Sequence, residues 1–242
     1  MMTSDSVAVG AADTPVVFDP YNPEIARNPY PVYKRMREEA PLYYNEEYDF
    51  YALSRYDDVR AGHANHETFS SAKGGILEMI KANIEMPPGM FIFEDPPLHT
   101  AHRSIIARMF SPRRMRDLES MVRGLTVATL EPLVGKKEFD FIADIGAEIP
   151  MRVIGMLLGI PEEDFQKVRQ NADDNMRTEA GKPMNYEAKP LLASAGVFEQ
   201  YIDWREDNPS DDVMTELLTV EFVDETGTKR RLTKAEILTF CN

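Results

Sequence analysis

Cysteine is almost missing from this sequence, which has a single one, Cys241, in 242 residues. An internal disulfide is therefore excluded, and a reducing, cytoplasmic location is expected. The first residues contain no basic stretch followed by an apolar run, so we expect no secretory signal peptide. No apolar run approaches the roughly 20 residues that cross a bilayer, so we expect no membrane span.

Positive charge is also scarce. The chain has 27 lysines and arginines against 41 aspartates and glutamates, for a net charge of -14. This balance argues against a general nucleic-acid-binding protein, which needs a basic surface. It also argues against binding to anionic membranes. A local basic cluster in such a chain is correspondingly informative.

The common phosphate and nucleophile motifs are absent, since the sequence has no GxGxxG, Walker or GxSxG pattern. Hydrophobic residues make up 43% and charged residues 28%, as in ordinary globular proteins. Residues 1–17 are small and polar, and we expect a disordered tail there. The remaining residues, 18–242, are enough for a sizeable core.

Helical periodicity dominates residues 18–242, with little β structure. Residues 41–54 have the aromatic pattern of a two-stranded hairpin, and a turn or small hairpin is expected around Gly227. Residues 74–90 predict an extended loop with one helical segment, and loops of that length are usually functional or mobile. The sequence thus predicts a mainly α fold with a small β component.

Several helix boundaries carry local signals. Ser111 before Pro112 is expected to begin a helix, and Gly159 to end another. Thr233 is a predicted N-cap, with Glu236 in the capping-box position. A further helix is expected to begin at Ser210 or Asp211, after a long helix that ends near residue 207.

Residues 93–115, "FEDPPLHTAHRSIIARMFSPRRM", are the most informative stretch. Asp95 as N-cap and Pro96 at the first helical position predict a helix over residues 96–110. Its core-facing stripe is expected to contain four apolar residues: Leu98, Ala101, Ile105 and Met109.

His99 and Arg103 lie one turn apart on the other side of this predicted helix. Ile106 and Phe110 continue their stripe. A matching ligand would carry carboxylates or phosphates at one edge and a flat apolar body beside them, because arginine binds such anions bidentately. The alternative is an ordinary solvated helix face.

The four histidines of the chain fall into two His-x-x-His pairs, and each pair could face a metal from one side of a helix. The four are His63, His66, His99 and His102. Chance pairing is the alternative to a metal site.

A basic cluster follows the same helix, formed by Arg108, Arg113, Arg114 and Arg116. It could dock an acidic partner protein that is steered by charge. The alternative is a solvated surface paired with local acids such as Asp117 and Glu119.

Apolar residues of the long loop could line a substrate pocket, although methionines in loops more often only pack. The candidates are Ile76, Leu77, Ile80, Met86 and Met90. Cys241 lies on a helical pattern and is expected to be a buried small hydrophobe.

Residues 93–115 resemble the helix C signature of bacterial cytochrome P450 haem-thiolate monooxygenases, with D-P-P, H-T-x-x-R and F-[ST]-P-R in order. Other stretches resemble the same family, namely "NPYPVYKRMREEAP", "FYALSRYDDVRAGHANHETFSS", "MLLGIPEEDF", "NPSDDVMTELLTVE" and "RLTKAEILTFCN". The resemblance covers about residues 18–242 in the family's order. It implies one domain, the N-terminal part of the cytochrome P450 fold from helix A to early helix I.

The resemblance implies that His99 and Arg103 bind the haem propionates. It places Arg108, Arg113 and Arg114 on the face that receives electrons from a ferredoxin or flavodoxin. The segment from residue 74 to residue 93 corresponds to the loop that roofs the substrate pocket, and residues 165–198 correspond to the mobile F–G region. The implied activity inserts one oxygen atom from O2 into an apolar small molecule.

Two family features are missing from these 242 residues: the axial cysteine motif and the acid-threonine pair of helix I. Cys241 is not that ligand, because its surroundings resemble helix I. His102 also departs from the family, which commonly has an apolar or aromatic residue there. We therefore expect this chain alone to hold haem incompletely, to lack oxygen activation, and to be poorly soluble or molten.

Overall fold

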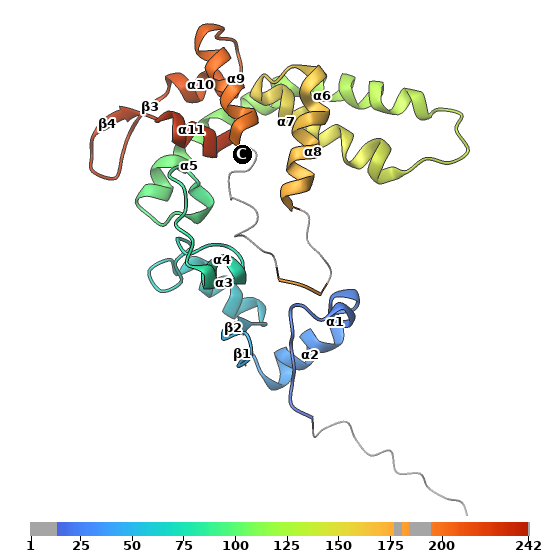
Figure 1. Cartoon of the computed structure of the whole chain (residues 1–242), viewed down its shortest axis with the longest axis vertical. Coiled ribbons are helices and arrows are strands. Elements are labelled where there is room, and N and C mark those ends of the chain that lie inside the picture. The colour runs from blue at the N-terminus through green and yellow to red at the C-terminus, as the bar shows by residue number, and fades with distance from the viewer. Residues whose placement is uncertain (1–13, 177–180, 184–194, 242) are drawn as a thin grey trace, which may run out of the picture. The chain divides into compact units, whose positions relative to one another are not determined.

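The computed structural model describes residues 14–176, 181–183 and 195–241. These form two compact units, residues 14–69 with 181–183 and residues 70–176 with 195–241 (Figure 1). Each unit is mainly helical and contains one small antiparallel hairpin. The predicted fold class is therefore confirmed.

The smaller unit consists of short helices around a hairpin. Its elements are α1 (Pro23–Arg27), α2 (Tyr30–Glu39), β1 (Leu42–Asn45), β2 (Phe50–Leu53) and α3 (Tyr56–Ala64). The strands pair in the predicted place, with Tyr44 opposite Tyr51 and their rings 4.7 Å apart. The side chain of Asn45 donates a 2.9 Å hydrogen bond to the carbonyl of Phe18, which fixes the chain from that residue onward. The predicted tail lies mostly outside the described residues.

The larger unit contains the remaining elements, in which η1, η2 and η4 are 3-10 helices and η3 is a π-helix. They are α4 (Leu77–Ala82), η1 (Phe91–Phe93), α5 (Leu98–Met109), α6 (Pro112–Leu130), η2 (Glu131–Leu133), η3 (Ile142–Gly146), α7 (Glu148–Leu158), η4 (Glu162–Asp164), α8 (Phe165–Met176), α9 (Ala195–Asp207), α10 (Val213–Thr219), β3 (Glu221–Val223), β4 (Lys229–Arg231) and α11 (Lys234–Cys241). Of the long helix predicted before residue 207, residues 184–194 lie outside the described residues. Across the described chain, no helix combines the length and apolar character needed to cross a membrane.

The hydrophobic core of the larger unit draws side chains from α5, α7 to α11 and β3, and we call its part among α5, α9, α10 and α11 the packed corner; Figure 1 shows the last three in orange and red. Ile202 of α9 and Leu217 of α10 are fully inaccessible. Ile105 and Met109 of α5 are buried in the same cluster, as the apolar stripe predicted. Burial of such side chains contributes about 1.5–3 kcal/mol each.

The local boundary signals mostly act as predicted. The backbone N–H of Thr233 donates to Glu236 Oε2 at 2.7 Å, and that of Glu236 donates to Thr233 Oγ1 at 3.2 Å, which completes the capping box. Gly159 ends α7 with φ of 71°, a left-handed conformation that favours glycine. The β3–β4 hairpin turns at Gly227, also as predicted. Ser111 precedes α6, but its side chain forms no capping hydrogen bond.

Two predicted helix starts are wrong by one or two residues. Helix α5 begins at Leu98, and the Asp95 carboxylate accepts hydrogen bonds from the Ser70 hydroxyl and the Ser71 N–H. Helix α10 begins after Asp212, whose carboxylate accepts from the N–H of Thr215 at 2.8 Å. The preceding residues, 210 and 211, lie outside that helix.

Candidate functional site

Helix α5 presents His99 and Arg103 one turn apart, as predicted. His99 is half-buried, and its ring lies 6.5 Å from the ring of Phe91 in η1. Arg103 is exposed. Neither side chain forms an ion pair or hydrogen bond with another described residue. Their donors are therefore available to an anionic group at this edge of the helix.

The apolar part of the same stripe is divided. Phe110 is 44% exposed, whereas Ile106 packs against the core of the larger unit. The surface beside the two donors is therefore partly apolar and partly used by the fold itself.

His102 is the residue of this helix that sequence reasoning placed wrongly. It was paired with His99 as a possible metal ligand, but it is only 1% exposed and its Nδ1 lies 2.7 Å from Glu94 Oε2. Its ring also packs against the rings of Phe222 and Phe240, with centroids 5.5 and 5.4 Å away. Its position three residues before the buried Ile105 was the signal that could have placed it in the core stripe.

The structure gives no support to the metal hypothesis. Among the described residues, no group of three or more histidine, cysteine, aspartate or glutamate side chains could hold a metal ion. His63 and His66 are exposed near the end of α3 in the smaller unit. His102 is buried at 1% exposure, with the rings of Phe222 and Phe240 packed against its imidazole.

The basic cluster is only partly free. Arg114 forms an ion pair with Glu216 and lies 3.6 Å from Asp211. Its acidic partners are therefore far away in the sequence, in place of the expected Asp117 and Glu119. Arg108 and Arg113 are exposed and form no ion pair with any described residue. These two remain available to an acidic surface.

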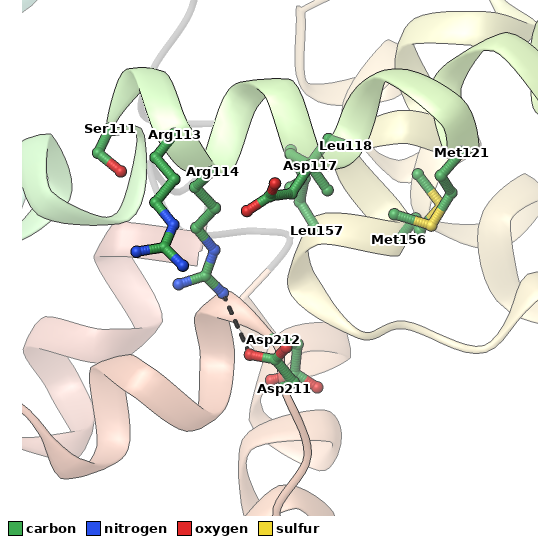
Figure 2. Close-up of a pocket in the computed structure, with 10 residues that line it drawn as sticks. All are labelled: Ser111, Arg113, Arg114, Asp117, Leu118, Met121, Met156, Leu157, Asp211 and Asp212. Atoms are coloured by element: carbon green, nitrogen blue, oxygen red, sulfur yellow. Dashed lines mark ion pairs between the residues drawn. The ribbon is translucent and has the colours of Figure 1, made fainter.

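A cleft of about 460 Å³ lies beside this cluster. Figure 2 shows the residues that line it. Arg113 and Arg114 reach into it from α6, and Asp211 and Asp212 approach from the turn before α10. Both signs of charge therefore line the cleft, which is poorly suited to a strongly charged ligand.

The five loop residues proposed for a substrate pocket are all at least partly exposed, and none of them lines that cleft. Ile80, for example, is 49% exposed. The residue of α4 that is buried is Met79, at 4% exposure, which the sequence analysis did not select.

Cys241 is buried on α11, as predicted. Burial, together with the nearby Asp212 carboxylate, raises the pKa of its thiol to about 12. The free thiol is therefore neutral near pH 7, and its side chain packs within the hydrophobic core.

Known proteins resemble this chain over nearly its whole length, although no model of a protein family matches it. Cytochrome P450 130 of Mycobacterium tuberculosis (strain ATCC 25618 / H37Rv) is 33% identical over 213 residues, which cover 79% of this chain and 49% of that protein. Another relative from the same strain, also named as a cytochrome P450, is 32% identical over 238 residues, 97% of this chain and 58% of the relative. The chain belongs to the cytochrome P450 family.

Solved P450 structures agree with this assignment. The enzyme CYP109B1 from Bacillus subtilis is 27% identical, with a TM-score of 0.67 over 92% of this chain and 55% of that one. The structure of CYP109E1 from Bacillus megaterium in complex with testosterone has a TM-score of 0.74 at 23% identity, which shows the fold alone. The chain spans about half the length of the curated relatives it matches, and it corresponds to their N-terminal part.

The cytochrome P450 family implies a haem cofactor. The donor set on α5 fits the anionic edge of haem, because an imidazole and a guanidinium one turn apart can both donate to carboxylates. Cys241 does not fit the role of the iron ligand, because its side chain packs within the hydrophobic core of the larger unit.

Proposed function

We propose that His99 and Arg103 bind the propionate carboxylates of haem in a P450 monooxygenase. The observation that carries this proposal is their pairing on α5, one turn apart and without partners among the described residues. Arg103 can grip one carboxylate with two parallel hydrogen bonds, and the His99 ring can donate one more. Both units would then be parts of one P450 domain over residues 18–242, because the relatives align across both.

The complete protein would insert one oxygen atom from O2 into an apolar small molecule. Haem with a thiolate ligand supplies the O–O cleavage of this chemistry when it is bound. This chain would supply part of the substrate enclosure through the loop from residue 74 to residue 93. Ile76, Leu77, Ile80, Met86 and Met90 are the candidate contacts, and their partial exposure leaves apolar atoms for a ligand to cover.

Electrons would come from an acidic ferredoxin or flavodoxin. Arg108 and Arg113 are the candidates for docking it, because both are exposed and unpaired among the described residues. Arg114 is a weaker candidate than the sequence predicted, since releasing it would break its ion pair with Glu216. Such exposed charges affect the association rate more than the final affinity.

The 242 residues alone would not activate oxygen and would hold haem incompletely. Their single cysteine is packed within the hydrophobic core, so they provide no accessible thiolate ligand of the kind that drives O–O cleavage. We expect the reduced chain with carbon monoxide to lack a thiolate-type spectrum, and such a spectrum would contradict the proposal. The cytoplasmic location stays a prediction, because it rests on the single cysteine.

Titration of the chain with haem tests the proposed propionate site. His99→Ala and Arg103→Ala should each weaken haem affinity roughly tenfold, because each removes a hydrogen bond to a charged acceptor. Arg108→Ala is the matched control, since it removes another exposed arginine from the same helix. Equal affinities for Arg103→Ala and Arg108→Ala would refute the assignment.

A further inference from the structure

A buried polar cluster surrounds His102 in the packed corner, and the proposed function does not use it. The His102 imidazole bonds to Glu94 through Nδ1 at 2.7 Å. Its other nitrogen, Nε2, is buried without a hydrogen bond and lies 3.6 Å from Glu236 Oε1. Both Glu236 oxygens already accept from Arg230 at 2.8 Å. The bond to Glu94 is therefore the directional interaction of this imidazole.

Glu94 joins that imidazole to the segment before α5. Its other carboxylate oxygen accepts from the backbone N–H of Gly89 at 3.2 Å, so one carboxylate closes the loop over residues 89–94. The same segment is bound to α11, because the Thr239 hydroxyl donates to the carbonyl of Pro88 at 2.7 Å. The Glu94 side chain is only 10% exposed, so loss of its donor would leave a poorly solvated carboxylate.

The closed loop carries Phe91, which touches the candidate haem-binding residue. The Phe91 ring lies 5.5 Å from the ring of Phe240 on α11 and 6.5 Å from the ring of His99. His102 packs edge-on against that same Phe240 ring. The two histidines of α5 therefore meet one aromatic cluster, His99 through Phe91 and His102 directly.

We propose that His102 is a positioning residue for the propionate site. Its hydrogen bond to Glu94 would hold the 89–94 loop closed, and the closed loop would hold Phe91 against His99. The ring of His99 would then be fixed for donation before haem arrives, which lowers the cost of ordering it on binding. This inference rests on the proposed function of His99.

Two substitutions separate the hydrogen bond from simple packing. His102→Leu introduces an apolar side chain of similar size and removes the N–H donor to Glu94. His102→Asn keeps an N–H donor near the position of Nδ1 but leaves part of the space empty. If His102 is a positioning residue, His102→Asn should keep the 89–94 loop closed better than His102→Leu does. If His102 only packs, the order of the two variants should be reversed.

Hydrogen exchange of the backbone amides of residues 89–94 in the 242-residue chain is the first measurement. His102→Leu should speed exchange at Gly89 roughly tenfold, because the acceptor Glu94 is released. His102→Asn should stay within about threefold of the unchanged chain. Ile105→Val is the control for a general loss of core packing on α5, and it should leave Gly89 unchanged. Faster exchange at Gly89 in the His102→Asn variant than in the His102→Leu variant would overturn the proposal.

Haem affinity is the second measurement, and it separates the two proposals. His102→Leu should weaken affinity several-fold, while His102→Asn and Ile105→Val should not. If His99→Ala does not weaken haem binding, the proposed function fails whatever His102 does. If His99→Ala does weaken it but His102→Leu does not, the propionate site stands and the positioning role is refuted.

Discussion

The packed corner and helix α6 differ in environment, although apolar residues at helical spacing occur in both, in the corner on α5. The corner contains side chains with no accessible surface, such as Leu217. In α6 no residue is buried, and Met121 and Val127 are 42% and 48% exposed. The difference is the presence of partners: α9, α10 and α11 pack on one another in the corner, whereas α7, η2 and η3 are the main neighbours of α6 among the described residues.

This contrast shows that apolar periodicity predicts a helix but not its burial. A stripe is buried only when another element covers it. Because the relatives of this chain are about twice as long, we propose that their remaining half covers the corresponding face of α6. The chain alone should then combine a protected corner with a loosely held α6, and it should bind hydrophobic dyes.

The largest expected effect comes from breaking the buried ion pair between Arg205 and Asp212. Their side chains are 7% and 4% exposed and 2.9 Å apart, and Arg205 also donates to the carbonyl of Gly159 at 2.6 Å. Arg205→Ala should lower the free energy of opening of the α10 amides by about 3–5 kcal/mol, because it leaves a buried carboxylate unpaired. Hydrogen exchange measures this energy.

The control for that substitution is Arg123→Ala. Arg123 pairs with Glu119 on the exposed surface of α6, where such pairs contribute about 0.5 kcal/mol or less. Similar effects for the two arginines would show that the corner is no better packed than α6.

A second substitution compares apolar side chains of the two regions. Leu217→Ala should destabilise the corner by roughly 3 kcal/mol, since it opens a cavity at a site without accessible surface. Met121→Ala on α6 should change the free energy of opening of the α6 amides by less than about 0.5 kcal/mol, because that side chain is already 42% exposed. A large effect of Met121→Ala would mean that α6 is covered in solution.

Acid should loosen the corner before it affects α6. Burial acts to raise the pKa of Glu236, but hydrogen bonds from Arg230 and Thr233 outweigh it and lower the pKa to about 2, from an ordinary 4.5. The ionised carboxylate therefore stabilises the fold above pH 4.5, and this contribution is lost as the pH falls from 4.5 toward 2.

The fluorescence of Trp204, the single tryptophan, reports this acid transition from α9, which packs on α11. Glu236→Gln should flatten the pH dependence between 4.5 and 2. An unchanged acid transition in that variant would show that another carboxylate controls it. Asp224, whose pKa the Thr226 hydroxyl and other donors lower to about 2, is the next candidate.

The smallest expected effect tests the helix caps of the two regions. Thr233→Ala should destabilise α11 by about 1 kcal/mol, because it removes the acceptor of the capping box. Ser111→Ala at the start of α6 should have almost no effect, because its hydroxyl forms no capping bond. Hydrogen exchange of the first backbone amides of α11 and α6 measures the two effects. Equal losses of stability in Thr233→Ala and Ser111→Ala would contradict the difference between the two caps.

The features that could be predicted from the sequence are those that depend on short-range interactions. The hairpin of residues 42–53, the end of α7 at Gly159 and the capping box of Thr233 all follow from neighbouring residues. The spacing of His99 and Arg103 follows from the helical repeat. The family resemblance rested on such local motifs, and the comparisons confirmed it.

The partners of the polar side chains depend instead on the packing of the whole chain. His102 lies between Glu94 and Glu236, Asp95 bonds to Ser70, and Arg114 pairs with a glutamate 102 positions away. None of these contacts has a local sequence signal, because distant segments must pack before the groups meet. Burial then decides their roles, since a polar group that has lost water must find a partner within the fold.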